Sequence, residues 1–364
     1  MKVRYKHSGN RTFAVAEVYS EEEHGIHLSE IDDDAVLVVG KLRDSGFETY
    51  IVGGAVRDLI LGKIPKDFDV VTQATPRQIH RIFRNSMIIG RRFRLVHVIF
   101  GQKIIEVSTF RSRDDKGKKS SNVFGTIEED ATKRDFSINS LYYDPFENVV
   151  IDYTGAMKDI RKGVITSLIP LNRTFREDPV RMIRALKYSV TTGFKLKINL
   201  RLAIRRYASL LMKVSSSRMT EEVNKIFYSG YCCPIIKKLS SYGLLVYMMP
   251  CASVYSEFES FTESLEKLDR FVLDIKENSG TLSDAEKSHV LFLFASSVVN
   301  TDFTDSEQGI TRKDIVRQIK VLISPNTPPN YIIERAAAEF IPKNKKVNKS
   351  GTPSRKKKQS QLQN

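Results

Sequence analysis

The alternation of apolar and polar residues predicts a mixed first part and a helical remainder. Residues 31–46 carry apolar side chains at helical spacing and end at Gly46, which predicts a helix. Two β-type runs, 49–52 and 68–72, enclose a predicted helix of residues 55–61. Thr75–Pro76 is typical of a helix start, so we expect a helix to about residue 85. Runs 95–100 and 104–110, separated by Gly101–Gln102, predict a β-hairpin.

This order of elements predicts an α+β fold with a small mixed sheet in an N-terminal head, residues 31–150. Helices are expected on one side of that sheet. Residues 1–30 show little periodicity, and we interpret them as an N-terminal arm. The polar segment 112–121 predicts a loop. From Glu177 to about Phe340 the pattern is almost wholly helical, most clearly in residues 218–228, 234–245, 254–275 and 285–298.

The net charge of +15 indicates attraction to a polyanion, either a nucleic acid or a membrane surface. Part of this charge lies in the last 24 residues, 341–364, which include eight Lys and Arg. Because this segment has few apolar residues, we expect a disordered tail. Without those eight the body still carries about +7. The N-terminus lacks the apolar core of a secretory signal peptide. The sequence also has no run of about 18 apolar residues, as a membrane helix would need, so we expect a cytoplasmic protein.

Two aspartates two residues apart carry the first candidate chemistry. In a strand, Asp67 and Asp69 of KDFDV would project from the same face, with Phe68 on the other. Close carboxylates repel, and two magnesium ions would relieve that repulsion. Two such ions can activate an attacking hydroxyl and steady a leaving pyrophosphate. The alternative to a metal site is an acidic strand end that faces solvent.

A third carboxylate has two candidates. Glu106 is the only charged residue within the apolar run 104–110, and a lone acid there needs either solvent or a function. Asp135, in KRDFSIN, is the second candidate. The sequence does not choose between them.

Gly53–Gly54 stands between a predicted strand and a predicted helix, where the backbone can approach a phosphate closely. Arg57 would add a charge-assisted contact to a triphosphate. A plain strand–turn–helix junction also explains the pattern.

A third segment, REDPVRMIRA, places Asp178, Arg181 and Arg184 three residues apart near one helix face. Pro179 suits the first turn of that helix and Asp178 its cap. One interpretation is a helix cap followed by a solvated basic face. The other is a site that recognises a nucleobase, a base reader. Asp accepts hydrogen bonds and Arg donates them, so the pair would accept adenine and cytosine and reject guanine and uracil.

Six ordered motifs then resemble one family. GGAVRD, KDFDV, IIEVSTFR, KRDFSINSLYYD, DYTGAMKDIRKGVI and REDPVRMIRAL, over roughly residues 31–250, are similar to the bacterial poly(A) polymerase and CCA-adding enzyme family, class II of the nucleotidyltransferase superfamily. The resemblance implies a catalytic head, a neck with the base-recognition helix (151–215) and an RNA-binding body and tail (216–340). It also implies magnesium dependence, with Asp67 and Asp69 as metal ligands. The nucleotide-binding residues we predict are Gly53, Gly54, Arg57, Arg134, Asn139, Asp178, Arg181 and Arg184.

Within the family, IIGRRFRLVHV resembles the segment that marks the poly(A) polymerase branch. Arg91, Arg92 and Arg94 would follow an RNA backbone or a triphosphate, or form a solvated strand end. The basic tail suits an enzyme that holds varied RNA by charge. We therefore expect AMP transfer from ATP to RNA 3′ ends. The alternatives are CCA addition to tRNA at the same site and a catalytically silent RNA-binding homologue.

Overall fold

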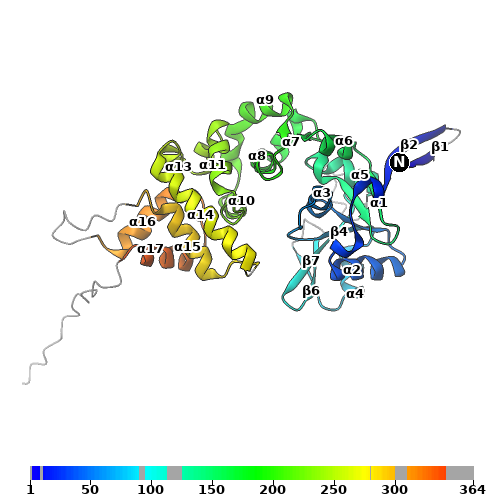
Figure 1. Ribbon diagram of the computed structural model, residues 1–364, viewed down its shortest axis with the longest axis horizontal. Coiled ribbons are helices and arrows are strands. Elements are labelled where there is room, and N and C mark those ends of the chain that lie inside the picture. Colours follow the sequence, from blue (N-terminus) through cyan, green and yellow to red (C-terminus); the bar gives the residue numbers. More distant parts are fainter. Residues whose placement is uncertain are drawn as a thin grey trace, which may run out of the picture. The chain divides into compact units, whose positions relative to one another are not determined.

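The computed structural model describes residues 2–8, 11–89, 95–112, 125–278, 280–299 and 310–341 (Figure 1). The chain forms two compact units. The first contains residues 1–226 and 234–248, and the second contains residues 227–233 and the chain from Met249 onward. Most of residues 112–121, the tail after residue 341, and Arg91, Arg92 and Arg94 lie outside the described residues.

The first unit is built on a nine-stranded sheet of order β1-β2-β9-β8-β3-β4-β7-β6-β5. β4 and β7 are parallel and the other neighbours antiparallel, so the predicted mixed sheet is confirmed. The strands are β1 (Lys2–Ser8), β2 (Arg11–Ser20), β3 (Thr49–Val52), β4 (Asp69–Thr72), β5 (Ser86–Ile89), β6 (Leu95–Phe100), β7 (Lys103–Thr109), β8 (Leu141–Asp144) and β9 (Val149–Asp152).

The expected N-terminal arm instead begins with a β-hairpin that extends this sheet. β1 pairs with β2, and β2 pairs with β9 through residues 17–20. Ala16 and Tyr19 of β2 are buried. The segment AVAEV within β2 has apolar residues at both odd and even positions, which hides the two-residue period of a strand.

Short helices connect the strands. They are α1 (Glu21–His24), η1 (Leu28–Glu30), α2 (Asp33–Asp44), α3 (Gly54–Ile60), α4 (Pro76–Ile82), α5 (Ile127–Lys133), η2 (Ser137–Asn139) and α6 (Ala156–Arg161). Asp32, Thr75 and Thr126 cap α2, α4 and α5 by accepting backbone N–H groups. The helix predicted to reach residue 85 ends at Ile82, because the chain turns into β5.

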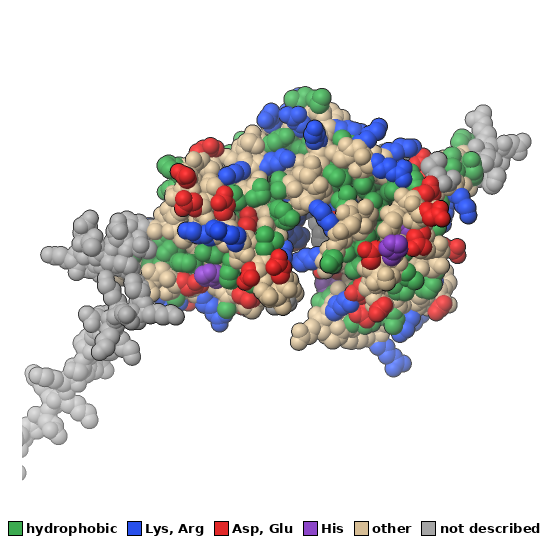
Figure 2. All heavy atoms as spheres, viewed as in Figure 1, with side chains coloured by type: hydrophobic (Ala, Val, Ile, Leu, Met, Phe, Trp, Pro, Cys, Tyr) green, Lys and Arg blue, Asp and Glu red, His purple; other side chains and the backbone are tan. Residues whose placement is uncertain are grey.

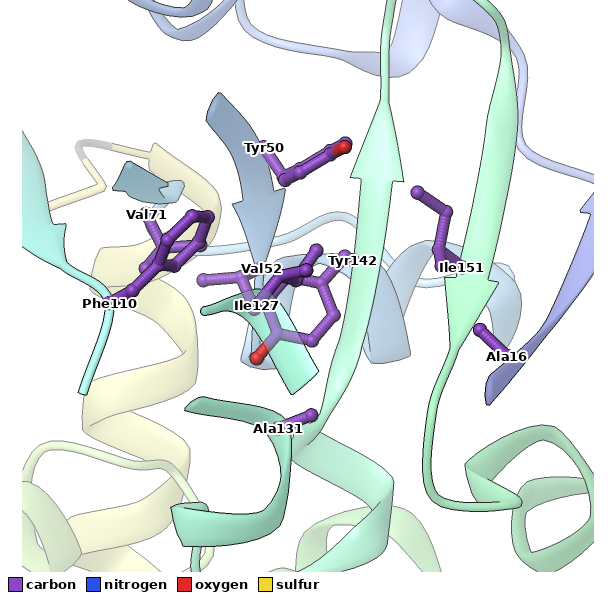
Figure 3. Packing of buried hydrophobic residues seen from close by; sticks show 9 residues of the cluster. All are labelled: Ala16, Tyr50, Val52, Val71, Phe110, Ile127, Ala131, Tyr142 and Ile151. Carbon is purple, nitrogen blue, oxygen red and sulfur yellow. The ribbon is translucent and has the colours of Figure 1, made fainter. Parts of the chain in front are cut away.

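One hydrophobic cluster of the head joins strands to α5 (Figure 3). Tyr142 lies at its centre, with Ile127 and Ala131 of α5 beside it. The remaining members are Ala16, Tyr50, Val52, Val71, Phe110 and Ile151. This packing fixes β3, β4 and β8 relative to α5. Gly53, Asp69 and Arg134 lie at the ends of β3, β4 and α5, and Asn139 lies two residues before β8.

The remainder is helical, as predicted, apart from a two-stranded parallel sheet of β10 and β11. The first unit continues with β10 (Val164–Ile165), α7 (Leu171–Glu177), α8 (Val180–Thr192), β11 (Lys195–Leu196), α9 (Ile198–Tyr207), η3 (Ala208–Lys213), α10 (Ser216–Phe227), α11 (Cys232–Ser241) and α12 (Leu245–Met248). The second unit contains α13 (Pro250–Tyr255), α14 (Glu259–Asn278), α15 (Asp284–Ala295), α16 (Arg312–Ile323) and α17 (Asn330–Glu339). The helix expected from residue 254 begins at Glu259, since Pro250 starts a separate short helix.

The second unit has an aromatic core of its own. Phe294 of α15 lies 4.6 Å from the ring of Phe227 and 5.4 Å from that of Phe261. Among the described residues we find no helix with the length and apolar character needed to cross a bilayer.

Candidate active site

A glycine turn joins β3 to α3 at one end of the sheet. Gly53 has φ 82° and ψ −131°, a conformation that residues with a side chain adopt only at a cost. A Cβ atom at Gly53 would lie 3.7 Å from both Arg134 Nη1 and Asp69 Oδ2. The backbone of the turn therefore lies against a cation predicted to bind the nucleotide and an acid predicted to bind metal.

The same end of the sheet brings two acids together. Asp69 is the first residue of β4 and is paired in register with Glu106 of the parallel strand β7. Asp67 lies in the loop that precedes β4 rather than on the strand. Asp67 and Asp69 therefore lie on the two sides of a loop–strand junction. The prediction that both project from one face of a strand is wrong.

The electrostatics of this cluster is unbalanced. Asp69 is exposed at the edge of the cavity, yet neighbouring protein atoms displace part of the water around its carboxylate, and the charges of Glu106 and Asp67 repel it. Together these effects raise the pKa of Asp69 to about 6, against the opposing attraction of Arg134. A carboxylate in this state favours a cation as neighbour.

The residues fit magnesium only in part. In the described part of the chain, no three His, Cys, Asp or Glu side chains form a cluster that could hold a metal ion alone. Magnesium usually binds to one or two protein carboxylates together with substrate phosphates. The acidic cluster around Asp69 is therefore suited to an ion that binds together with a nucleotide.

Asp135, the other candidate for the third acid, has different partners. Its carboxylate lies 3.0 Å from Arg184 Nη2. It also accepts hydrogen bonds from Phe136 N at 2.9 Å and from Asn139 Nδ2 at 3.3 Å. Asp135 therefore contacts other side chains of the site, whereas Glu106 lies next to Asp69.

Two arginines beside the glycine turn are held by hydrogen bonds. Arg57 Nη1 donates to Asn139 Oδ1 at 2.6 Å. Arg134 Nη2 donates to Asp130 Oδ2 at 2.8 Å, and its guanidinium lies over the Tyr142 ring. Burial alone would lower the pKa of Arg134, but Asp130 and Tyr142 raise it above its usual value. Both guanidiniums are therefore fixed in place beside the turn.

The predicted base reader lies at the start of α8. Asp178 lies two residues before this helix, whose N-cap residue is Pro179, and its Oδ1 accepts from Val180 N at 3.3 Å. Arg181 Nη1 donates to Thr174 Oγ1 at 3.0 Å. The distance between Arg181 Nε and Asp178 Oδ2 is 3.9 Å, so the two groups are neighbours without a hydrogen bond between them.

A cation that we did not predict contacts Asp178 more closely. Arg218, on α10, donates from Nη2 to Asp178 Oδ2 at 2.6 Å. It lies 40 residues after Asp178 in the sequence. α10 therefore contributes to the same site as α8.

These groups surround one cavity of about 590 Å³ in the first unit. Seven of its lining residues are Arg or Lys and three are Asp, so the cavity suits a polyanion. The predicted residues that line it are Gly53, Gly54, Arg57, Asp69, Arg134, Asp135, Asn139, Asp178, Arg181 and Arg184. Asp67 and Glu106 do not line the cavity, although their charges act on Asp69.

The cavity also contains residues that the sequence did not single out, namely Ser108, Thr109, Arg111, Ser112, Lys133, Tyr188 and Arg218. Tyr188 follows Arg184 by one helical turn, accepts a hydrogen bond from its Nη2 at 3.0 Å and lies under Arg57. Helical spacing from Arg184 would have indicated Tyr188. Arg218 has no such local signal.

Two family domains match the chain in order. Residues 49–166 match the Poly A polymerase head domain, and residues 193–255 match the domain described as "Probable RNA and SrmB- binding site of polymerase A".

Poly(A) polymerase I of Escherichia coli O157:H7 is 39% identical over 295 residues, which are 77% of this chain and 62% of that protein. The chain thus spans about three fifths of the length of this relative. For poly(A) polymerase I of Haemophilus influenzae the identity is 36% over 311 residues, 81% of this chain and 68% of that protein.

The CC-adding tRNA nucleotidyltransferase of Halalkalibacterium halodurans is 37% identical over 210 residues, 56% of this chain and 52% of that protein. Among solved structures, the Bacillus stearothermophilus CCA-adding enzyme in complex with CTP has the same fold. Its TM-score is 0.55 at 23% identity, covering 84% of this chain and 81% of that one. On the strength of the two family domains and the coverage of the Haemophilus protein, this chain belongs to the poly(A) polymerase and CCA-adding enzyme family of nucleotidyltransferases.

Proposed function

We propose that the chain transfers AMP from ATP to the 3′ ends of RNA. The observation that carries this proposal is the single cavity that contains the glycine turn, Asp69 and the Asp178–Arg181 pair. Those three parts correspond to the phosphates, the reacting centre and the base of a nucleoside triphosphate. Poly(A) polymerase I relatives match over 77–81% of the chain, against 56% for the CC-adding relative, which supports AMP as the added nucleotide.

In this mechanism the cationic wall holds the triphosphate. The backbone at Gly53 and Gly54 approaches the phosphates, and Arg57 and Arg134 neutralise their charge. Both guanidiniums are already oriented, by Asn139 and Asp130 respectively, so little is lost in ordering them when the nucleotide binds.

Asp67 and Asp69 would hold magnesium together with the phosphates, with Glu106 next to Asp69. Bound there, magnesium would lower the charge of the triphosphate and favour ionisation of the attacking hydroxyl. The RNA 3′-oxygen forms a bond to the α-phosphorus as the bond to the bridging oxygen breaks, and pyrophosphate leaves. The chain's own contribution to this step is positioning and charge neutralisation.

At the base, Asp178 accepts from an exocyclic amine and Arg181 donates to a ring nitrogen, a pattern shared by adenine and cytosine. This shared pattern, together with the 37% identity to the CC-adding relative, keeps tRNA CCA addition as the second candidate.

One assay separates the two candidates. Purified protein is incubated with magnesium and labelled nucleoside triphosphates, singly and as an ATP–CTP mixture. The acceptors are tRNA ending before CCA and an unstructured oligoribonucleotide. We expect A-tails on both RNAs with ATP alone. Addition of C then A that stops on the tRNA, with no extension of the oligoribonucleotide, would reject polyadenylation. A reaction with EDTA in place of magnesium should show no incorporation.

A further inference from the structure

Tyr188 is a residue of the nucleotide cavity that has no part in the reaction described above. It lies on α8, on the helix face that also carries Arg181 and Arg184, at intervals of three and four residues. Its side chain is half-buried and lines the cavity. A phenylalanine would supply the same ring, so what the tyrosine adds is a hydroxyl group in a polar cavity.

Three contacts hold the Tyr188 side chain in one orientation. Its ring packs edge-on against the buried ring of Phe136, with centroids 6.1 Å apart. The Arg57 guanidinium lies over the ring, with Cζ 5.2 Å from the centroid. The hydroxyl accepts a hydrogen bond from Arg184 Nη2 at 3.0 Å, and the same nitrogen lies 3.0 Å from Asp135 Oδ2. The hydroxyl oxygen is therefore fixed in place before any ligand binds.

The hydroxyl hydrogen of Tyr188 is available to a ligand. A tyrosine hydroxyl can donate one hydrogen bond as well as accept one. Because an arginine side chain only donates, the bond with Arg184 uses the oxygen of Tyr188 and leaves its hydrogen unused. Among the residues that the structure describes, none accepts a hydrogen bond from this hydroxyl. A fixed donor that lines a cavity suits an acceptor on the molecule that fills it.

The position of Tyr188 along α8 indicates which part of a nucleotide it would face. Asp178 and Arg181, the base reader, lie at the start of this helix, and Tyr188 follows about 10 Å further along its axis. On its other side Tyr188 contacts Arg57, and a Cβ atom at Gly54 would lie 3.6 Å from Arg57 Nη2. In a nucleoside triphosphate the ribose joins the base to the phosphates. A nucleotide that spans from the base reader to the glycine turn therefore has its ribose beside Tyr188.

We propose that Tyr188 is a specificity-determining residue that recognises the ribose of the bound nucleotide. Its hydroxyl donates to the oxygen of a ribose hydroxyl group, while Arg184 and the ring contacts hold the phenol in position. The deoxynucleotide that lacks this oxygen cannot accept the bond, so the site selects the ribonucleotide. The inference rests on the proposed function in one respect, namely that a nucleoside triphosphate binds in this cavity.

A purely supporting role for the Tyr188 hydroxyl makes a different prediction. If the hydroxyl only held Arg184 next to Asp135, its loss would weaken the binding of ribonucleotides and deoxynucleotides equally. Recognition of the ribose instead changes the ratio between the Kd of a deoxynucleotide and the Kd of ATP. This ratio therefore separates the two roles.

The test measures nucleotide binding without RNA, so that no transfer takes place. Isothermal titration calorimetry with magnesium gives the Kd of ATP, 2′-deoxy-ATP and 3′-deoxy-ATP for the wild type and for Tyr188→Phe. For the wild type we expect one deoxynucleotide to bind about fivefold more weakly than ATP, as for one lost hydrogen bond between uncharged groups. In Tyr188→Phe the same ratio should fall to about one, because neither nucleotide can form the bond.

Tyr242→Phe is the matched control. Tyr242 is also half-buried and also lies under a guanidinium, that of Arg205 on α9, with Cζ 4.9 Å from the ring centroid. It does not line the nucleotide cavity. Figure 2 shows Lys and Arg side chains on the surface over α9. The control should leave the three Kd values unchanged.

Two results would overturn the proposal. One is a wild type that binds all three nucleotides equally, and the other is a Tyr188→Phe variant that keeps the wild-type ratio. Tyr188→Phe retains the ring between Phe136 and Arg57, so we expect it to fold, and thermal unfolding checks this.

Failure of this inference is distinguishable from failure of the proposed function. If the wild type extends RNA with ATP but Tyr188→Phe keeps the ratio, only the role of Tyr188 is wrong. If the ratio falls in Tyr188→Phe while the wild type transfers no AMP, Tyr188 recognises the ribose and the proposed activity is wrong. A wild type that binds none of the three nucleotides rejects both. In the active case, the preference for ATP over the deoxynucleotide in kcat/KM should fall about fivefold in Tyr188→Phe, with the RNA KM unchanged.

Discussion

Asp69 is the residue in which function and stability are most directly opposed. Its raised pKa, about 6, results from loss of water around the carboxylate and from repulsion by Glu106 and Asp67. The folded protein therefore holds the ionised form at a cost above pH 6. That cost disappears as the pH falls through 6 towards the ordinary value of 3.8.

Asp69→Asn should consequently stabilise the metal-free protein at pH 8. Because Asp69 is exposed and solvent screens part of the repulsion, we expect a gain of only about 1 kcal/mol, which corresponds to a rise in Tm of roughly 2–4 °C for a domain of this size. Differential scanning calorimetry with EDTA measures it. The gain should vanish near pH 4. The exposed Asp44→Asn on α2 is the control and should leave Tm unchanged; a lower Tm for Asp69→Asn would contradict our account of this site.

Asp178 makes the second residue-scale prediction. Removing the acceptor that recognises the exocyclic amine should lower kcat/KM for ATP by about 10- to 100-fold, the range for one hydrogen bond to a charged group. Steady-state extension of an oligoribonucleotide by Asp178→Ala checks this, with the neighbouring Glu177→Ala as a matched control. Discrimination between ATP and GTP should fall in Asp178→Ala. If discrimination stays at the wild-type level, Asp178 does not read the base.

The local sequence predicted those residues that act within one element. Each of these motifs, such as the glycine turn or the Asp178–Arg181–Arg184 helix start, spans no more than about ten residues of sequence. Ten of the predicted residues line one cavity. Arg218 could not be found in this way, since its contact with Asp178 depends on how α10 packs on the start of α8. We wrongly predicted Asp67 on a strand, because β4 begins only at Asp69.

At the scale of elements, α5 fixes the cationic wall of the site to the sheet. Asp130 in this helix is almost fully buried and binds Arg134 as well as the Tyr142 hydroxyl, at 2.8 Å and 2.7 Å. Burial alone would raise the pKa of Asp130, but Arg134, Arg111 and the Tyr142 hydrogen bond hold it below 3.8. The arrangement links a helix, a β8 tyrosine and the arginine beside the glycine turn.

Asp130→Asn should destabilise the protein by about 3–5 kcal/mol, because it leaves a buried guanidinium without its countercharge. Tyr142→Phe, which removes only the hydroxyl, should cost about 1 kcal/mol. Urea unfolding monitored by circular dichroism measures both. Since the folded pKa of Asp130 lies below 3.8, its contribution is complete above that pH and is lost below it. Equal stability of wild type and Asp130→Asn at pH 7 would show that the ion pair contributes nothing.

The predicted helices and strands agree with the structure where one hydrophobic period, that of a helix or that of a strand, dominated the sequence. The helices with a clear apolar face and the 95–110 hairpin lie where expected, within a few residues. The β1–β2 hairpin was missed because apolar side chains occur on both faces of β2. Its place in the sheet depends on pairing with β9, which is about 130 residues away and leaves no mark in the local pattern.

For the whole molecule, the charge agrees with the proposed substrate. A net charge of +15 indicated a polyanionic partner, and the structure places two cation-lined cavities together in the first unit. The second of these, a cavity of about 720 Å³ lined by Arg176, Lys213 and Arg218, was indicated by neither the charge nor the motifs, because its walls come from α7, α8, α9, η3 and α10.

The central claim is that Asp69 belongs to a nucleotidyl-transfer site that extends RNA with AMP. The measurement that tests it most directly compares wild type, Asp69→Asn and Asp44→Asn for incorporation of labelled ATP into an unstructured oligoribonucleotide with magnesium. We predict extension by wild type and Asp44→Asn, a loss of at least about 100-fold in Asp69→Asn, and equal RNA binding by all three. Undiminished incorporation by a folded Asp69→Asn variant would contradict the account.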